Sequence, residues 1–189
     1  GPDFIKAHAV EDAGAVLALA AISPAQEKVV DFTAKNSQSR QIAHNIETLR
    51  TALEKDPNNA ETNFKLGVAY YSLGRYDRAV PALRNAVKSQ PDMLDAYMYL
   101  GNSLDYLDRG DEAAQAYQSA LKLDPRNARV YYEAALAYER QKRYAEASAA
   151  YNRAARYDPA NVDAQWGAAR TLYNSGEFQK AIPEYRKAM

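Results

Sequence analysis

The sequence predicts an all-α protein built as an array of repeated helical hairpins, an α-solenoid. The main observation is the interval between Pro57, Pro91, Pro125 and Pro159, because 91 − 57, 125 − 91 and 159 − 125 each give 34. A fixed period of roughly 20 to 50 residues is the sequence signature of a repeat array. Ala and Tyr are abundant while Gly and Pro are scarce, which favours helices over a turn-rich β fold.

Each period holds two stretches of helical character separated by a short break. A proline lacks the amide donor and disfavours helical geometry in the residue before it, so each second helix ends there. Asp or Asn beside the proline can then cap the next helix. The expected helices are Ala60–Leu73, Tyr76–Ser89, Leu94–Leu107, Asp111–Leu123, Ala128–Gln141, Tyr144–Tyr157, Val162–Ser175 and Phe178 to the end.

Small and large residues recur in register within these periods. Alanines return at intervals of 34 residues in two series, Ala79, Ala113, Ala147 and Ala181, and Ala86, Ala120, Ala154 and Ala188. We expect the large residues beside them to fill the space that they leave, namely Leu83, Tyr117, Tyr151 and Tyr185. Such packing between units is what stabilises a repeat array.

The second period resembles the tetratricopeptide repeat, through Tyr97-x2-Leu100-Gly101 followed by Ala113, Tyr117, Ala120 and Pro125. The resemblance covers residues 60–189 and implies a right-handed superhelical array of helix-turn-helix hairpins. The units are expected at 60–93, 94–127, 128–161 and 162–189, the last one cut short. Asn63 and Gln165 depart from the pattern, since a large aromatic residue is usual at their position.

Residues 24–59 are interpreted as a divergent hairpin ahead of these four units. Ser23-Pro24-Ala25-Gln26 forms a capping box with proline at the first helical position, which starts a helix running to about Lys35. The polar residues 36–39 are expected to form the turn. The second helix is expected at Ser39–Lys55, with Ile42, Ile46, Leu49, Ala52 and Leu53 on one face.

The N-terminal residues are interpreted separately. Gly1-Pro2 is expected to be a tag-cleavage scar, and residues 3–23 a capping or docking helix, with a processed or membrane-adjacent remnant as the alternative. Ala13–Ile22 is apolar but too short to span a bilayer, which takes roughly 20 residues. Glu11 and Asp12 have the wrong charge for the start of a signal peptide.

Composition and motifs argue against several classes of function. With 24 acidic and 24 basic residues the net charge is zero, which removes the broad electrostatic attraction that nucleic acid or an anionic membrane would need. Neither a nucleic acid partner nor direct membrane insertion is expected. The chain has no cysteine, which excludes disulfides and thiolate metal sites but leaves cytoplasm and periplasm both open. His8 and His44 share no metal spacing with carboxylates, and no catalytic motif is present, so neither an enzyme nor a cofactor is expected.

The resemblance implies that the first helix of each unit lines the concave side of the array. The side chains left on these helices after the packing residues are assigned form an unusually aromatic stripe. Aromatic residues, Met and Arg are enriched at the centres of interfaces. We therefore expect a groove for a peptide or protein segment, with gap-filling between hairpins as the alternative. The groove residues are Phe64, Lys65, Val68, Tyr71, Met98, Tyr99, Asn102, Tyr106, Arg129, Tyr132, Leu136, Arg140, Trp166, Arg170 and Tyr173.

Four further features carry no function in this interpretation. The carboxylate clamp by which some tetratricopeptide domains hold chaperone tails is absent, because Phe64 and Val68 stand where its first Lys and Asn would be. Asp105, Asp108 and Asp111 are interpreted as solvated turn residues, and the Arg-Gly-Asp tripeptide at 109–111 as a chance occurrence. Pro81 and Pro183, early in two second helices, imply either a later helix start or a bend.

The predicted function is a non-catalytic protein-interaction scaffold or adaptor. One alternative is self-assembly into a homo-oligomer through an uncapped C-terminal end bordered by Ile182 and Tyr185. Another is an accessory binding domain of a larger enzyme or of a secretion or biogenesis complex. The sequence does not identify the partner.

Overall fold

The computed structural model describes residues 37–189, and this part of the chain is an all-α array without strands. Its helices are α3 (Ser37–Lys55), α4 (Ala60–Ser72), α5 (Tyr76–Ser89), α6 (Leu94–Tyr106), α7 (Gly110–Leu123), α8 (Ala128–Arg140), α9 (Tyr144–Tyr157), α10 (Val162–Asn174) and α11 (Phe178–Ala188). From α4 onward every helix begins and ends within one residue of its predicted bounds. The predicted fold class is confirmed.

The start of α3 differs from the prediction. Residues 37–39 were expected in a turn, but they form the beginning of α3. Neither Gly nor Pro interrupts the chain at this point, and serine is well tolerated at the N-terminus of a helix. The helices expected in residues 3–23 and 24–35 lie outside the described residues.

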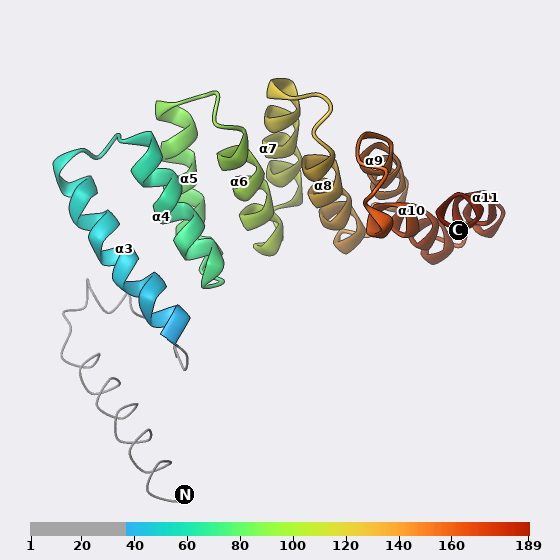
Figure 1. The fold of residues 1–189 in the computed structure, drawn as a ribbon, viewed down its shortest axis with the longest axis horizontal. Coiled ribbons are helices and arrows are strands. Elements are labelled where there is room, and N and C mark those ends of the chain that lie inside the picture. Colours follow the sequence, from blue (N-terminus) through green and yellow to red (C-terminus); the bar gives the residue numbers. More distant parts are fainter. Residues whose placement is uncertain (1–36) are drawn as a thin grey trace, which may run out of the picture.

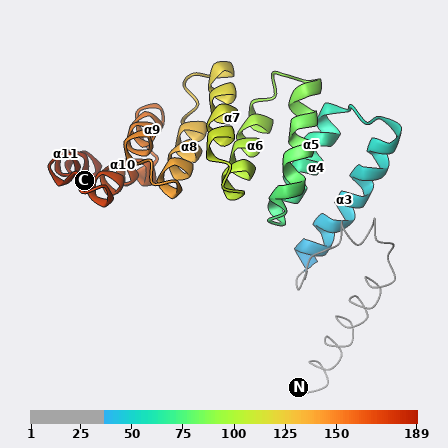
Figure 2. The same ribbon diagram turned by 180° about the vertical axis from the view of Figure 1, so that it is seen from behind.

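Consecutive helices pair into the antiparallel hairpins α4/α5, α6/α7, α8/α9 and α10/α11, which stack in one row from α3 to α11 (Figures 1 and 2). The first helices of neighbouring units also contact one another, α4 with α6 and α6 with α8. Because elements that approach one another lie at the smaller radius of a curved array, the first helices form its inner side. We call their inward surface the inner wall.

The hinges between units carry the predicted caps at three of four places. The Oδ1 atoms of Asn59, Asn127 and Asn161 each accept a hydrogen bond from a backbone amide in the first turn of the following helix, at 2.9, 3.1 and 2.9 Å. The fourth hinge has Met93 at the cap position and no side-chain cap bond. Asparagine caps therefore fix the entry into α4, α8 and α10.

Within each hairpin a large side chain fills space left by small ones. A Cβ atom built on Gly67 would lie 2.5 Å from Leu83 Cγ, and one on Gly101 would lie 2.7 Å from the ring of Tyr117. The third hairpin has Ala135 at the position of these glycines, and its Tyr151 also lies against the next unit, because a Cβ on Gly167 would come 2.7 Å from its ring. In the first three units the predicted large residues and the alanines of both series are fully buried, whereas Tyr185 and Ala188 of the last unit are half-buried.

The turn inside each hairpin contains one residue in the left-handed region of backbone space. These residues are again 34 apart, and their φ values are Gly74 69°, Asp108 57°, Lys142 57° and Gly176 82°. Glycine adopts this conformation without strain, whereas Asp and Lys do so at a cost. The Arg-Gly-Asp tripeptide spans the end of one such turn and the start of α7, consistent with its structural interpretation.

The two prolines within second helices do not mark later helix starts. Pro81 lies inside α5, which begins at Tyr76, and Pro183 lies inside α11, which begins at Phe178. Of the two structural alternatives, the later start is therefore wrong.

Candidate functional site

The fifteen predicted groove residues fall into three groups of solvent exposure. Seven are exposed, namely Lys65, Tyr106, Arg129, Arg140, Trp166, Arg170 and Tyr173. Six are half-buried, namely Phe64, Val68, Tyr71, Tyr99, Tyr132 and Leu136. The other two, Met98 and Asn102, are buried. Most of the predicted stripe is therefore accessible on the inner wall.

Met98 and Asn102 belong to the interior and not to an open groove. Met98 is only 1% exposed to solvent and Asn102 only 4%. The side-chain oxygen of Asn102 accepts a 2.6 Å hydrogen bond from the Tyr117 hydroxyl, and its amide donates to Glu133 at 3.2 Å. Since both side chains are enclosed by the protein itself, we leave them out of the proposed binding surface. The burial of these two residues agrees with the gap-filling alternative.

Aromatic rings from three helices form a connected cluster near the N-terminal end of the inner wall. The ring centroid of Tyr99 lies 6.1 Å from that of Phe64 and 5.2 Å from that of Tyr71, the latter pair edge to face. Tyr71 in turn lies 6.2 Å from Tyr106, which stacks on Tyr76 at 4.4 Å. Such contacts hold each ring in place, so this surface is organised before any partner binds.

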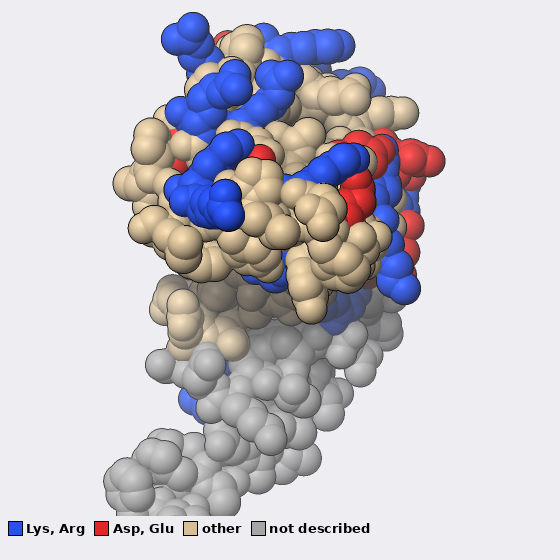
Figure 3. All heavy atoms as spheres, turned by 90° about the vertical axis from the view of Figure 1, so that its right-hand side faces the viewer, with Lys and Arg blue, Asp and Glu red and all other residues tan. Residues whose placement is uncertain are grey.

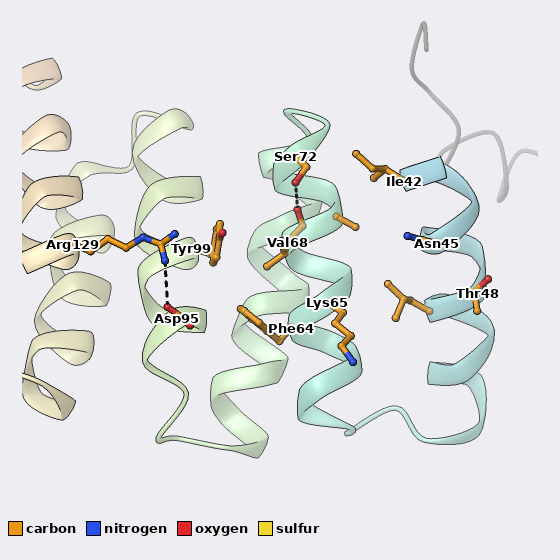
Figure 4. A pocket seen from close by; sticks show the side chains of 12 residues that line it. Ile42, Asn45, Thr48, Phe64, Lys65, Val68, Ser72, Asp95, Tyr99 and Arg129 are labelled. Carbon is orange, nitrogen blue, oxygen red and sulfur yellow. Dashed lines mark hydrogen bonds and ion pairs between the residues drawn. The ribbon is translucent and has the colours of Figure 1, made fainter. Parts of the chain in front are cut away.

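Every predicted groove cation already has a carboxylate partner. Lys65 Nζ lies 3.1 Å from Glu61, and Arg129 Nη1 lies 3.9 Å from Asp95 (Figure 4). Both pairs are largely exposed, so their contribution to stability is small. A partner carboxylate would have to compete with them.

The remaining two cations are held more firmly, each by a carboxylate of the preceding unit. Arg140 Nε donates to Asp105 Oδ2 at 2.6 Å, and Arg170 donates to Glu139 through Nε and Nη2 at 3.0 and 2.8 Å. Asp105 and Glu139 are equivalent positions, because 139 − 105 gives 34. This role was not predicted. Asp105 was expected to be a solvated turn residue, which is wrong, because its carboxylate is buried.

The environment of Glu139 favours its ionised form. Burial opposes ionisation, but the hydrogen bonds from Arg170 and from the Tyr151 hydroxyl, together with the nearby guanidinium charges, outweigh it and lower the pKa of Glu139. Burial is also the main reason why the pKa of Tyr71 is raised to about 12. The carboxylate is thus charged and the phenol neutral at neutral pH.

A groove of about 670 Å³ opens at the N-terminal end of the inner wall. We call it the N-terminal groove. Figure 4 shows side chains of α3 on one side of it and side chains of α4, Tyr99 and Arg129 on the other. Its lining is Ile42, Asn45, Thr48, Leu49, Phe64, Lys65, Val68, Ala69, Ser72, Asp95, Tyr99 and Arg129.

The contribution of α3 to this groove was not predicted. Ile42 and Leu49 were assigned to one apolar face, but Asn45 and Thr48 were not singled out. The 34-residue period could have indicated this contribution. The positions one period before Ala79 and Leu83 are Asn45 and Leu49, so both belong to the face of α3 that corresponds to a helix contact. At the first of these positions α3 has the polar Asn45, whereas all four later units have alanine.

Within residues 37–189, no group of three or more His, Asp or Glu side chains could hold a metal ion. No helix in the same part of the chain has the length and apolar character needed to cross a membrane. At the C-terminal end of the array, basic side chains are spread over the face, and most of the visible acidic side chains gather at one edge beside further basic ones (Figure 3). The exposed apolar residues of α11 include Phe178 and Ile182.

Stacked helical hairpins with an accessible inner wall define an α-solenoid of the class that serves as a protein-interaction scaffold. A sequence profile of the tetratricopeptide repeat matches residues 64–128, 100–156 and 132–189, and a profile of the TPR repeat matches residues 45–74. The chain belongs to the tetratricopeptide repeat family.

Solved structures of this family are similar in fold. A crystal structure of the MamA protein superposes with a TM-score of 0.74 at 25% identity, covering 88% of this chain and 91% of that one. Another MamA crystal structure gives 0.71 at 28% identity, covering 76% and 84%. YrrB, described as a TPR protein with an unusual peptide-binding site, gives 0.67 at 21% identity, covering 80% and 78%. Comparison with curated proteins gave no match.

Proposed function

We propose that the protein is a non-catalytic scaffold or adaptor whose inner wall binds a segment of another protein. One observation carries the proposal: large aromatic side chains remain accessible on successive first helices. Tyr99 and Tyr132 are half-buried, and Trp166 is 39% exposed. Rings that are fixed at one edge and open at the other are typical of the anchors that dominate protein interfaces.

The charge pairs on the inner wall indicate what kind of segment would bind. Because Arg129, Arg140 and Arg170 are each engaged with a carboxylate, the wall offers paired charges and not free cations. A partner would gain mainly from apolar and aromatic contacts along α6, α8 and α10. Neither nucleic acid nor a strongly acidic tail fits such a surface.

The test is capture of binding proteins on the immobilised chain, with two variants compared. The variant Tyr99→Ala/Tyr132→Ala/Trp166→Ala is expected to lose the captured proteins. The control Gln118→Ala/Leu123→Ala changes exposed residues of the second helix α7 and is expected to retain them. Helix content from circular dichroism must match between the two. Equal capture by both variants would reject the inner wall as the binding surface.

Self-association is a second candidate, favoured by the exposure of α11. Ile182 is 46% exposed, whereas the equivalent Val80, Ala114 and Ser148 are all buried. An apolar residue that neighbouring units bury elsewhere is open at this end. Light scattering over a wide concentration range tests the idea, since Ile182→Glu should abolish any dimer and a strict monomer would remove this candidate.

A further inference from the structure

The helix α3 stands in the place of a second helix, and within residues 37–189 no first helix lies against its inner face. In the later units the residues at two positions of this face are fully buried: Ala79, Ala113 and Ala147 at one, and Ala86, Ala120 and Ala154 at the other, each 0% exposed. The equivalent residues of α3, 34 positions earlier, are Asn45 and Ala52, and both are exposed. The face of α3 that corresponds to a helix contact is therefore open.

In the later units the covering element is the first helix of the same hairpin. Leu83 of α5 packs against Gly67 of α4, and Tyr117 of α7 packs against Gly101 of α6. Leu49, the equivalent of Leu83, instead lines the N-terminal groove. The groove thus occupies the position at which a further first helix would lie, beside α4 and against α3 (Figure 4).

We infer that residues 24–33 of this chain fill the N-terminal groove as a helix antiparallel to α3. The inference is independent of the proposed partner binding. Residue 36 directly precedes α3, so the segment is tethered at the edge of the groove. Residues 34–36 would make the reversal, a connection as long as residues 73–75 between α4 and α5.

The dimensions of this segment suit the groove. A helix of ten residues is about 15 Å long, at about 1.5 Å per residue. The stretch of α3 that lines the groove, from Ile42 to Leu49, spans about 10 Å on the same scale. The segment begins beside the first turn of α3 and runs back along it, so its length of about 15 Å brings it level with about residue 46. It is therefore long enough to cover Ile42 and Asn45 of the groove lining, but not Ala52.

The segment also has the chemistry that the groove requires. Ala25, Val29 and Phe32 follow the spacing i, i+4 and i+7, so they share one face of a helix. Glu27 and Asp31 lie on the opposite face and would remain in water. The apolar face of the segment would therefore pack into the mostly apolar groove. The array would then have one more helix at its N-terminal end.

Docking of this helix would divide the inner wall into two parts. The part that faces Ile42 and Asn45, with Val68, becomes interior. Tyr132 and Trp166, further along the array, do not line the groove and stay accessible to another protein.

Thiol labelling of the full chain tests the inference, because the chain has no cysteine of its own. Single variants Ala25→Cys and Val29→Cys report the face toward the groove, while Glu27→Cys and Asp31→Cys report the face toward water. With Ellman's reagent, the first two should react at least about tenfold more slowly than the last two, as expected when the docked state dominates.

A matched pair of substitutions on α3 shows whether the groove causes the protection. Asn45→Arg places a charged chain in the groove and should raise the reaction rates at 25 and 29 to those at 27 and 31. Thr51→Arg makes the same change at an exposed residue of α3 outside the groove lining and should leave the protection intact. Equal rates at all four cysteines in the otherwise unchanged chain would overturn the inference. So would protection that appears only as the protein concentration rises, which would assign the groove to a second copy.

Discussion

The side-chain amide of Asn63 donates a hydrogen bond to the backbone carbonyl of the hinge residue Pro57, with Nδ2 and O 2.9 Å apart. The same bond recurs two units later, where the Tyr131 hydroxyl donates to the Pro125 carbonyl at 3.3 Å. Asn63 thus departs from the usual aromatic residue and still preserves the contact that ties a first helix to its hinge.

Gln165 makes the third such bond, from Nε2 to the Pro159 carbonyl at 2.9 Å. Both departures from the repeat pattern, Asn63 and Gln165, are amides whose donor replaces a phenol hydroxyl. Asn63 is smaller than the aromatic residue that is usual at this position, so it leaves the volume of an aromatic ring unfilled. A pocket of about 520 Å³ adjoins it between α3 and α5, whereas the pocket beside Tyr97 in the next unit has about 180 Å³.

Substitutions of Asn63 should separate the hydrogen bond from the missing volume. Asn63→Ala removes the bond and is expected to lower the free energy of unfolding by about 1 kcal/mol. Asn63→Tyr restores both a donor and the ring, and it is expected to raise the free energy above that of the unchanged chain. Urea denaturation followed by circular dichroism measures both. A Tyr variant less stable than the Ala variant would contradict this account of the pocket.

Backbone strain in the hairpin turns can be tested with two substitutions that should change the stability of the protein in opposite directions. Lys142 adopts a positive φ, so Lys142→Gly should stabilise the protein by up to about 1 kcal/mol. Gly74 has the same conformation with no atom near the position of a Cβ, so Gly74→Ala should destabilise through the backbone alone. Thermal unfolding of the two variants should shift in opposite directions, and a shared direction would refute the assignment.

The salt bridge between Glu139 and Arg170 should make the free energy of unfolding depend on pH under acidic conditions. The folded state lowers the pKa of Glu139 below its ordinary value of 4.5, so the unfolded state binds the proton more tightly. The stabilisation is present above pH 4.5 and is lost as the pH falls through the folded-state pKa. Partial exposure limits it to about 1 kcal/mol or less.

Glu139→Gln isolates this effect. The variant should be less stable than the unchanged chain at pH 7, and the difference should shrink as the pH falls well below 4.5. Melting temperatures at a series of pH values provide the comparison. A difference that stays constant across the series would mean that the pair contributes nothing through its charge.

The sequence predicted the helices closely because each boundary is marked locally. Prolines end the second helices, asparagines cap most first helices, and a turn residue such as Gly74 or its equivalent separates the two. The first residue of α3 was missed for the same reason, since residues 36–39 carry no such mark.

The candidate site was harder to predict because burial depends on neighbouring units. Met98 occupies the same repeat position as Phe64 and Trp166, yet only Met98 is fully enclosed. Asp105 looks like a turn carboxylate in the sequence, but Arg140 folds back over it from the next unit. Periodicity reveals which face a side chain is on, whereas contacts with the next hairpin decide whether that side chain is open.

The most direct test of partner binding at the inner wall uses Trp166, the only tryptophan in the chain. Its fluorescence can be followed while a captured partner is titrated, together with its quenching by acrylamide. If the inner wall holds the partner, the emission should shift to shorter wavelength and quenching should decrease as Trp166, a residue 39% exposed in the free chain, is covered. Unchanged emission and quenching at a concentration where the complex is demonstrably formed would contradict binding at this surface.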